Sequence, residues 1–161
     1  MSNFQFLHSE WPDIFEIAKE AEDLANAKPR SSLVNSRAAL EKGIRWMFVN
    51  DERLFDEYDS KTHVGRLIQL KCLKKVTEKP LRRGLNLLQR LGNEAAHGEV
   101  TNIEKSTTAL KILFEFSSHL AVSYSSKEID IPEYNESLLT SGGVSNETKH
   151  DLEQLQIGCI I

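Results

Sequence analysis

The sequence predicts an all-α fold, a helical bundle of about five helices, and three observations support it. Apolar residues recur at spacings of three and four along most of the chain, which is the period of an amphipathic helix. Pro12, Pro29 and Pro80 stand where such periodic stretches begin, and proline is tolerated in the first turn of a helix. No stretch reads as a convincing strand.

Five helices are expected within residues 1–124, which we interpret as one helical domain. In chain order they begin near Pro12, at Pro29, after Thr62, at Pro80 and near Ile103. The second extends to about Asn50 and the fifth to about Tyr124, while the acidic residues 51–60 are predicted to form a loop. We expect one core, built from Leu40, Ile44, Leu85, Leu88, Leu110, Leu113 and Phe114.

The composition changes after the fifth helix. Residues 125–145 contain Ser, Glu, Pro132 and the pair Gly142-Gly143, and are interpreted as a polar connector. Ser145-Asn146 can then cap a short extra helix, so residues 146–161 are predicted to form a C-terminal helix and tail.

Composition excludes several classes of protein. No apolar run approaches the length of about 18 residues that a membrane span needs, and the N-terminus lacks the features of a signal peptide. Two cysteines without metal-ligand spacing fit the reducing cytoplasm. No phosphate-binding glycine loop is present, and the histidines are scattered. We therefore predict no cofactor and no metal.

The net charge of −4 conceals a strongly basic middle segment. Residues 61–90 hold nine Lys and Arg but only one acid, Glu78, whereas both flanking segments are acidic. Clustered positive charge is typical of phosphate binding. The candidate nucleic-acid-binding residues are Lys71, Lys74, Lys75, Arg82 and Arg83. The alternative is a solvated helix surface that pairs with the acidic segments.

A candidate catalytic motif follows directly. Arg90, Asn93 and His97 fall at i, i+3 and i+7, so on a helix they share one face. Arginine can hold a pentavalent phosphate, histidine can take the 2′-hydroxyl proton of RNA, and asparagine can orient the imidazole. A symmetric dimer would supply a second histidine as the acid. Alternatively, Arg90 pairs with Glu94, and His97 caps a helix end.

Gly92 leaves the local structure around this motif open. Glycine weakens a helix interior, so either the fourth helix continues through Gly92 or a new helix starts at Asn93.

The first three quarters of the chain resemble a known family. The segments that carry the resemblance are Asn3-Phe4-Gln5-Phe6-Leu7, Glu10-Trp11-Pro12, Ile14-Phe15-Glu16, Pro29-Arg30, Arg37-Ala38-Ala39-Leu40-Glu41, Arg45-Trp46 and Arg90-Leu91-Gly92-Asn93 with His97. Residues 3–124 resemble the start of the restriction subunit of type I restriction enzymes. The resemblance implies an amino-terminal accessory domain, which in those enzymes precedes a nuclease and a motor. Neither of these is recognisable here.

That accessory domain is itself similar to the HEPN superfamily of helical bundles. Many members carry an arginine, four to six residues and then a histidine, and cleave RNA as dimers. The resemblance implies Arg90 and His97 as the catalytic pair, with Asn93 beside them. Leu91 stands where the family often has a polar residue, and many members of the superfamily are inactive binding modules.

We interpret the chain as an accessory domain of a type I restriction-modification system, a host defence against viruses, that contacts nucleic acid or protein. The expected partners are RNA or DNA, other restriction-modification subunits, or a second copy of the chain. A metal-independent HEPN-type endoribonuclease acting as a homodimer is one alternative. A pure dimerisation or docking domain is the other.

Overall fold

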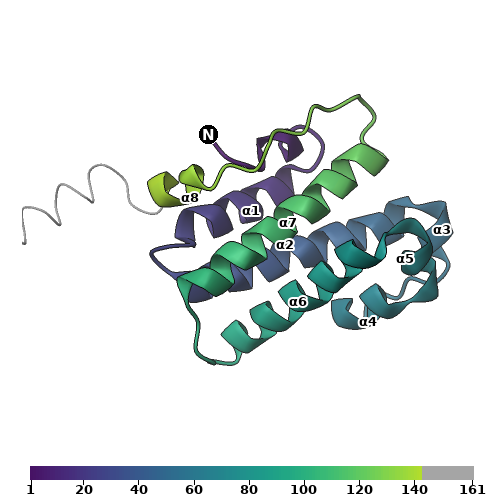
Figure 1. Ribbon diagram of the computed structural model, residues 1–161. Helices are drawn as coiled ribbons and strands as arrows, with labels where there is room; N and C mark the ends of the chain where they lie inside the picture. Colours follow the sequence, from purple (N-terminus) through teal and green to yellow (C-terminus); the bar gives the residue numbers. More distant parts are fainter. Residues whose placement is uncertain (143–161) are drawn as a thin grey trace, which may run out of the picture.

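The computed structural model describes residues 1–142, and all regular structure in that part of the chain is helical (Figure 1). A short 3-10 turn, η1 (Gln5–Leu7), comes first. The α-helices are α1 (Pro12–Leu24), α2 (Pro29–Asn50), α3 (Glu52–Phe55), α4 (Val64–Gln69), α5 (Lys71–Val76), α6 (Lys79–Ala96), α7 (Ile103–Tyr124) and α8 (Ser137–Gly142). The predicted all-α bundle is confirmed.

Four long helices form the bundle, and three short ones gather at one end of it. α2 contacts α1, α6 and α7, so it is the central helix. α3, α4 and α5 lie beside the C-terminal end of α2 and the start of α6 (Figure 1). This arrangement brings the basic segment 61–90 together at one end of the molecule.

The core is close to the predicted one. Six of its seven expected members are fully buried: Leu40, Ile44, Leu85, Leu88, Leu110 and Leu113. Phe114 is only half-buried, because its ring lies at the edge of the core. There it meets the rings of Phe4, Phe6 and Tyr134, with centroids 6.2, 5.9 and 5.2 Å away.

α6 continues through Gly92, so the alternative of a new helix at Asn93 is wrong. A β-carbon at Gly92 would lie 2.5 Å from Cβ of Arg37, which shows that α6 approaches α2 closely at this point. The glycine is therefore explained by packing between helices. The helix ends at Ala96 with His97 as its C-cap, and Gly98 (φ 83°) follows in the left-handed region. The N–H groups of Gly98 and Glu99 bond back to the carbonyls of Ala95 and Glu94.

The stretch expected to be a loop contains a helix. Asp51 is the N-cap of α3, and its carboxylate accepts a bond of 2.9 Å from the backbone N–H of Arg53. Asp51 was one of the acidic residues on which the loop prediction was based, but its side chain starts a helix instead. The third predicted helix is also divided in two, because Leu70 is extended (φ −66°, ψ 141°) between α4 and α5.

The chain after α7 folds back onto the N-terminal segment. Residues 125–136 form no helix, and Asn3 exchanges two hydrogen bonds with the backbone of Asn135, of 3.1 and 2.8 Å. α8 lies within the predicted connector and contacts α1. The extra helix predicted in residues 146–161 lies outside the described residues. No helix in residues 1–142 is long and apolar enough to span a membrane.

Candidate nucleic-acid interface

A polar face runs along the whole of α6 and ends one residue beyond it. Its members recur every three or four residues: Lys79, Arg82, Arg83, Asn86, Arg90, Asn93 and His97. All are exposed or half-buried. Eighteen helical residues extend about 27 Å at 1.5 Å per residue. Arg82 and Arg83 of the predicted basic cluster therefore share one surface with the predicted Arg–Asn–His motif, and we call this surface the polar face of α6. The other three members of the cluster, Lys71, Lys74 and Lys75, lie on α5.

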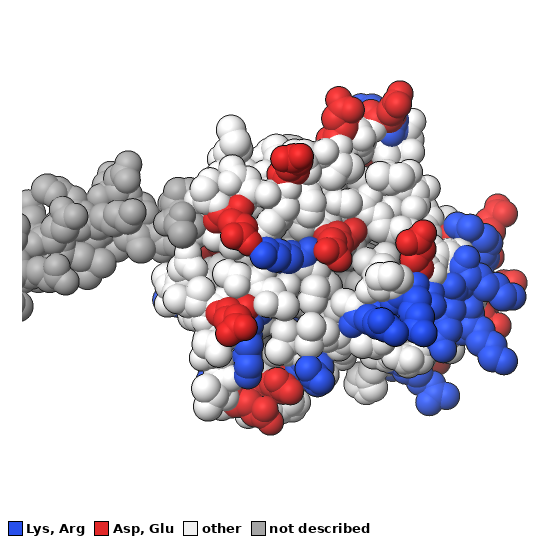
Figure 2. Space-filling model, viewed as in Figure 1, with Lys and Arg blue, Asp and Glu red and all other residues white. Residues whose placement is uncertain are grey.

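The first half of this face borders a hollow of about 230 Å³. It is formed where α4, α5 and α6 meet, and we call it the basic hollow. Its lining residues are Ile68, Gln69, Lys74, Lys79, Arg82, Arg83 and Asn86. Four are cations and none is an acid, so nothing in the lining neutralises the positive charge. Figure 2 shows Lys and Arg gathered over this end of the molecule.

Arg82 has a structural role in addition to its charge. Its Nη1 donates to the carbonyl of Lys74 at 3.1 Å, to the carbonyl of Thr77, and to Oγ1 of Thr77 at 3.4 Å. These carbonyls lie at the end of α5, where a helix leaves its last carbonyls unpaired. Arg82 is therefore half-buried, whereas Lys71, Lys74, Lys75 and Arg83 are exposed.

Two amide side chains close one rim of the basic hollow. Nε2 of Gln69 donates to Oδ1 of Asn86 at 2.6 Å, which ties α4 to α6. The Nδ2 of Asn86 makes no hydrogen bond within the described residues and is a donor at the rim. Gln69, Lys79 and Asn86 were not among the predicted binding residues. Lys79 and Asn86 could have been found from the spacing, because they lie at i−3 and i+4 relative to Arg82.

The one acid of the basic segment belongs to a different surface. Glu78 precedes α6 and lines a separate hollow with Glu115, His119 and Lys75. Burial lowers the pKa of His119, so its imidazole is neutral near pH 7. The charges of this second hollow are mixed, which distinguishes it from the basic hollow.

The second half of the polar face carries the predicted catalytic motif. The Arg90 side chain is 68% exposed, and its Nε lies 3.8 Å from Oε1 of Glu94, so this pair is loose. His97 is exposed at the C-cap position of α6, and its backbone N–H bonds to the carbonyl of Asn93 at 3.0 Å. Both the phosphate-binding and the helix-end interpretations of these residues are compatible with this geometry.

Asn93 does not orient the His97 ring. Its Oδ1 accepts a hydrogen bond from Nη1 of Arg37, which comes from α2. A second arginine of α2, Arg30, donates to the carbonyl of Glu99 at 3.1 Å just beyond the helix end. The sequence analysis did not connect Arg37 or Arg30 with the motif, because no local spacing relates α2 to α6.

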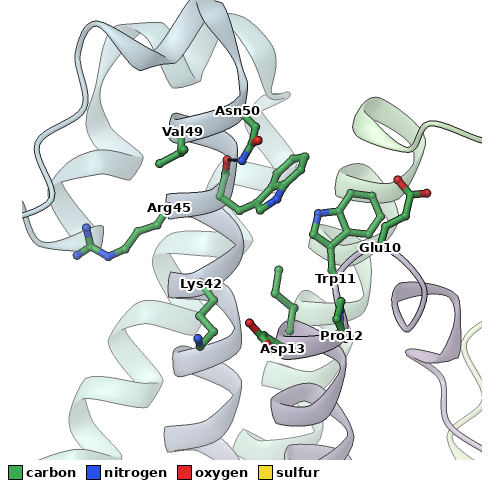
Figure 3. A pocket seen from close by; sticks show the side chains of 10 residues that line it. Glu10, Trp11, Pro12, Asp13, Lys42, Arg45, Val49 and Asn50 are labelled. Atoms are coloured by element: carbon green, nitrogen blue, oxygen red, sulfur yellow. Dashed lines mark hydrogen bonds between the residues drawn. The ribbon is translucent and has the colours of Figure 1, made fainter.

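A groove of about 440 Å³ lies elsewhere, between α1 and α2 (Figure 3). Trp11 and Trp46 meet edge to face at 5.4 Å, so the two rings pack against each other. Glu10 and Arg45 line this groove, but their charged ends point away from it: Glu10 accepts hydrogen bonds from Ser125 and Ser126, and Arg45 donates to Glu41 and to the carbonyl of Thr62 (Figure 3). No member of the polar face of α6 lines this groove.

Comparison of the chain with protein-family models, curated proteins and solved structures finds no match.

Proposed function

We propose that this chain is an accessory helical domain that contacts nucleic acid through the first half of the polar face of α6. One observation carries the proposal: four cations line the basic hollow without an acid among them. Ordinary solvated surfaces intersperse charges of both signs, and the remainder of the face seen in Figure 2 does so. A concentration of one sign is what phosphate binding requires.

We place this domain in a type I restriction-modification system because residues 3–124 resemble the start of the restriction subunit. In that setting the domain would bring the enzyme to nucleic acid or to another subunit. Of these two roles, the charge of the basic hollow favours contact with nucleic acid.

A salt titration tests the nucleic-acid contact. Anisotropy of a labelled single strand, in RNA and DNA versions, should show affinity that falls steeply between about 50 and about 200 mM salt, because bound cations displace counterions from the phosphates. The double variant Lys74→Ala/Arg83→Ala should weaken binding about tenfold. It should also reduce the slope of log affinity against log salt by about 1.5, since each neutralised phosphate accounts for about 0.7–0.9 of that slope.

A matched control removes two cations that lie on α1 and α2. Lys19→Ala/Lys42→Ala changes the net charge equally but leaves the polar face of α6 intact. The control should bind nearly as tightly as the wild type. Equal losses in both double variants, or affinity that does not depend on salt, would contradict the proposal. A pure docking domain would bind no nucleic acid and keep its protein partner in all three proteins.

A homodimeric, metal-independent endoribonuclease is the second candidate. It is favoured by the exposure of Arg90 and His97 on one face of α6. The two residues are seven positions apart, about 10 Å along the helix axis. One phosphate would therefore be reached more directly by Arg90 of one copy and His97 of another than by both from one copy.

A further inference from the structure

We propose that the basic hollow binds the terminal phosphate of a nucleic-acid strand, a phosphate monoester at the strand end. This inference rests on the proposed nucleic-acid contact and names the group that the contact selects. Its basis is the juxtaposition of Lys74, Lys79 and Arg83 with a free amide of Asn86 around a recess.

The shape of the site favours a strand end. An internal phosphate has the chain continuing on both sides, so it is held best by a ridge or an open groove. The basic hollow is a recess of about 230 Å³, bounded by α4, α5 and α6, and two of its lining side chains, Gln69 and Asn86, are joined by a hydrogen bond. A group that projects from the end of a strand can enter such a recess without bending the strand.

The charge of the site favours the same group. A phosphate monoester carries about −1.5 to −2 at pH 7, whereas an internal phosphate diester carries about −1. Four cations and no acid line the hollow, which is more positive charge than one diester needs. The first turn of α6 adds its helix dipole, whose positive end favours an anion at Lys79.

The site is also held in place before any ligand binds. Nη1 of Arg82 is fixed by the carbonyls of Lys74 and Thr77, and the other nitrogens of the guanidinium make no hydrogen bond within residues 1–142. Oδ1 of Asn86 is fixed by Gln69, which leaves Nδ2 free to donate. Donors that are oriented in advance lose little entropy when they bind an anion. Beyond the hollow, the polar face of α6 continues toward Arg90 and offers a path for the rest of the strand.

Competition among short strands tests the proposal. Strands of one sequence, as RNA and as DNA, carry a 5′-phosphate, a 3′-phosphate or only hydroxyl ends, and each displaces a labelled strand from the full chain. One phosphorylated end should bind about tenfold tighter than the hydroxyl end, a difference of about 1.4 kcal/mol. Equal affinity for all three ends would overturn the inference while leaving the proposed nucleic-acid contact intact. Absence of any binding would instead overturn the proposed contact itself.

Two double variants with the same reduction in charge test whether the preference for a phosphorylated strand end comes from the basic hollow. Lys74→Ala/Lys79→Ala empties the hollow of two cations, whereas Lys71→Ala/Lys75→Ala removes two cations from α5 outside it. The first should bind phosphorylated and hydroxyl ends equally. The second should weaken both strands while keeping their ratio. A preference that survives in the first variant would overturn the assignment to this hollow. A free 5′ mononucleotide that competes as well as the phosphorylated strand would overturn the assignment to strand ends.

Discussion

The two halves of the polar face of α6 share one spacing but differ in what surrounds them. The first half, Lys79–Asn86, faces two short helices that add Lys74 and no acid, so its charge is left unneutralised. In the second half, Glu94 lies near Arg90, and Arg37 of α2 holds Asn93. Position on a helix face is therefore set by spacing, whereas the chemistry of each half is set by neighbours from other helices.

The halves also differ in how closely α6 packs. At Gly92 the helix lies so near α2 that a β-carbon would meet Arg37 at 2.5 Å. At Gly84, on the first half, the nearest atom to a β-carbon would be a methyl of Ile112 at 3.2 Å. α6 therefore approaches Arg37 of α2 at Gly92 more closely than it approaches Ile112 of α7 at Gly84.

The largest loss of stability is expected at Gly92, where α6 approaches α2 closely. Gly92→Ala should lower the free energy of unfolding by up to about 2 kcal/mol, because overpacking costs about 1–3 kcal/mol and the better helix propensity of alanine returns about 1. Urea unfolding measures the change. Gly65→Ala is the matched control, since its β-carbon would lie 3.4 Å from the flexible end of Gln89. The control should be neutral or slightly stabilising. Equal effects at both glycines would show that close packing does not explain Gly92.

A smaller loss of stability should distinguish Arg82 from Arg83, two adjacent arginines in the first half of the polar face. Arg82→Ala should destabilise the fold by about 1 kcal/mol, because it removes hydrogen bonds of a half-buried guanidinium from the end of α5. Arg83→Ala should change the stability by less than about 0.5 kcal/mol, as is usual for a surface side chain without such bonds. Thermal melts of both variants measure this. A neutral Arg82→Ala would mean that the bonds to Lys74 and Thr77 contribute little.

Several elements of the fold could be predicted from local signals. Prolines marked the first turns of α1, α2 and α6, and apolar spacing indicated the extent of α7. α3 was missed because the side chain that starts it, Asp51, belongs to a type that is equally common in loops. The division at Leu70 was also missed, since nothing in the local composition requires an extended residue there.

The candidate site was only half predictable for a related reason. The basic segment and the Arg–Asn–His spacing are properties of consecutive residues, so they are visible in the sequence. The recess between α4, α5 and α6 is a tertiary feature. So is the bond from Arg37 to Asn93, whose partners are 56 residues apart. In a single sequence, a glycine that allows two helices to approach closely, as Gly92 does, looks the same as a glycine that weakens a helix.

The smallest change in stability is expected for His97→Ala. This variant distinguishes a structural role of the second half of the polar face from a catalytic one. The His97 side chain is exposed, and its imidazole makes no hydrogen bond to the described residues, so His97→Ala should change the free energy of unfolding by less than about 0.5 kcal/mol. A decrease of about 1 kcal/mol or more would identify a structural cap instead. The same variant addresses catalysis, because a stable protein can be tested directly with RNA.

If the wild type cleaves RNA with chelator present and leaves 2′,3′-cyclic phosphate ends, His97→Ala should abolish that cleavage without affecting stability. Arg90→Ala should do the same, and mixing the two inactive variants should restore part of the activity if a dimer joins Arg90 of one copy to His97 of another. No cleavage by the wild type, together with unchanged strand binding by His97→Ala, would limit the function of α6 to its first half. We expect this second outcome, because Glu94 already lies near Arg90 and Asn93 is held by Arg37.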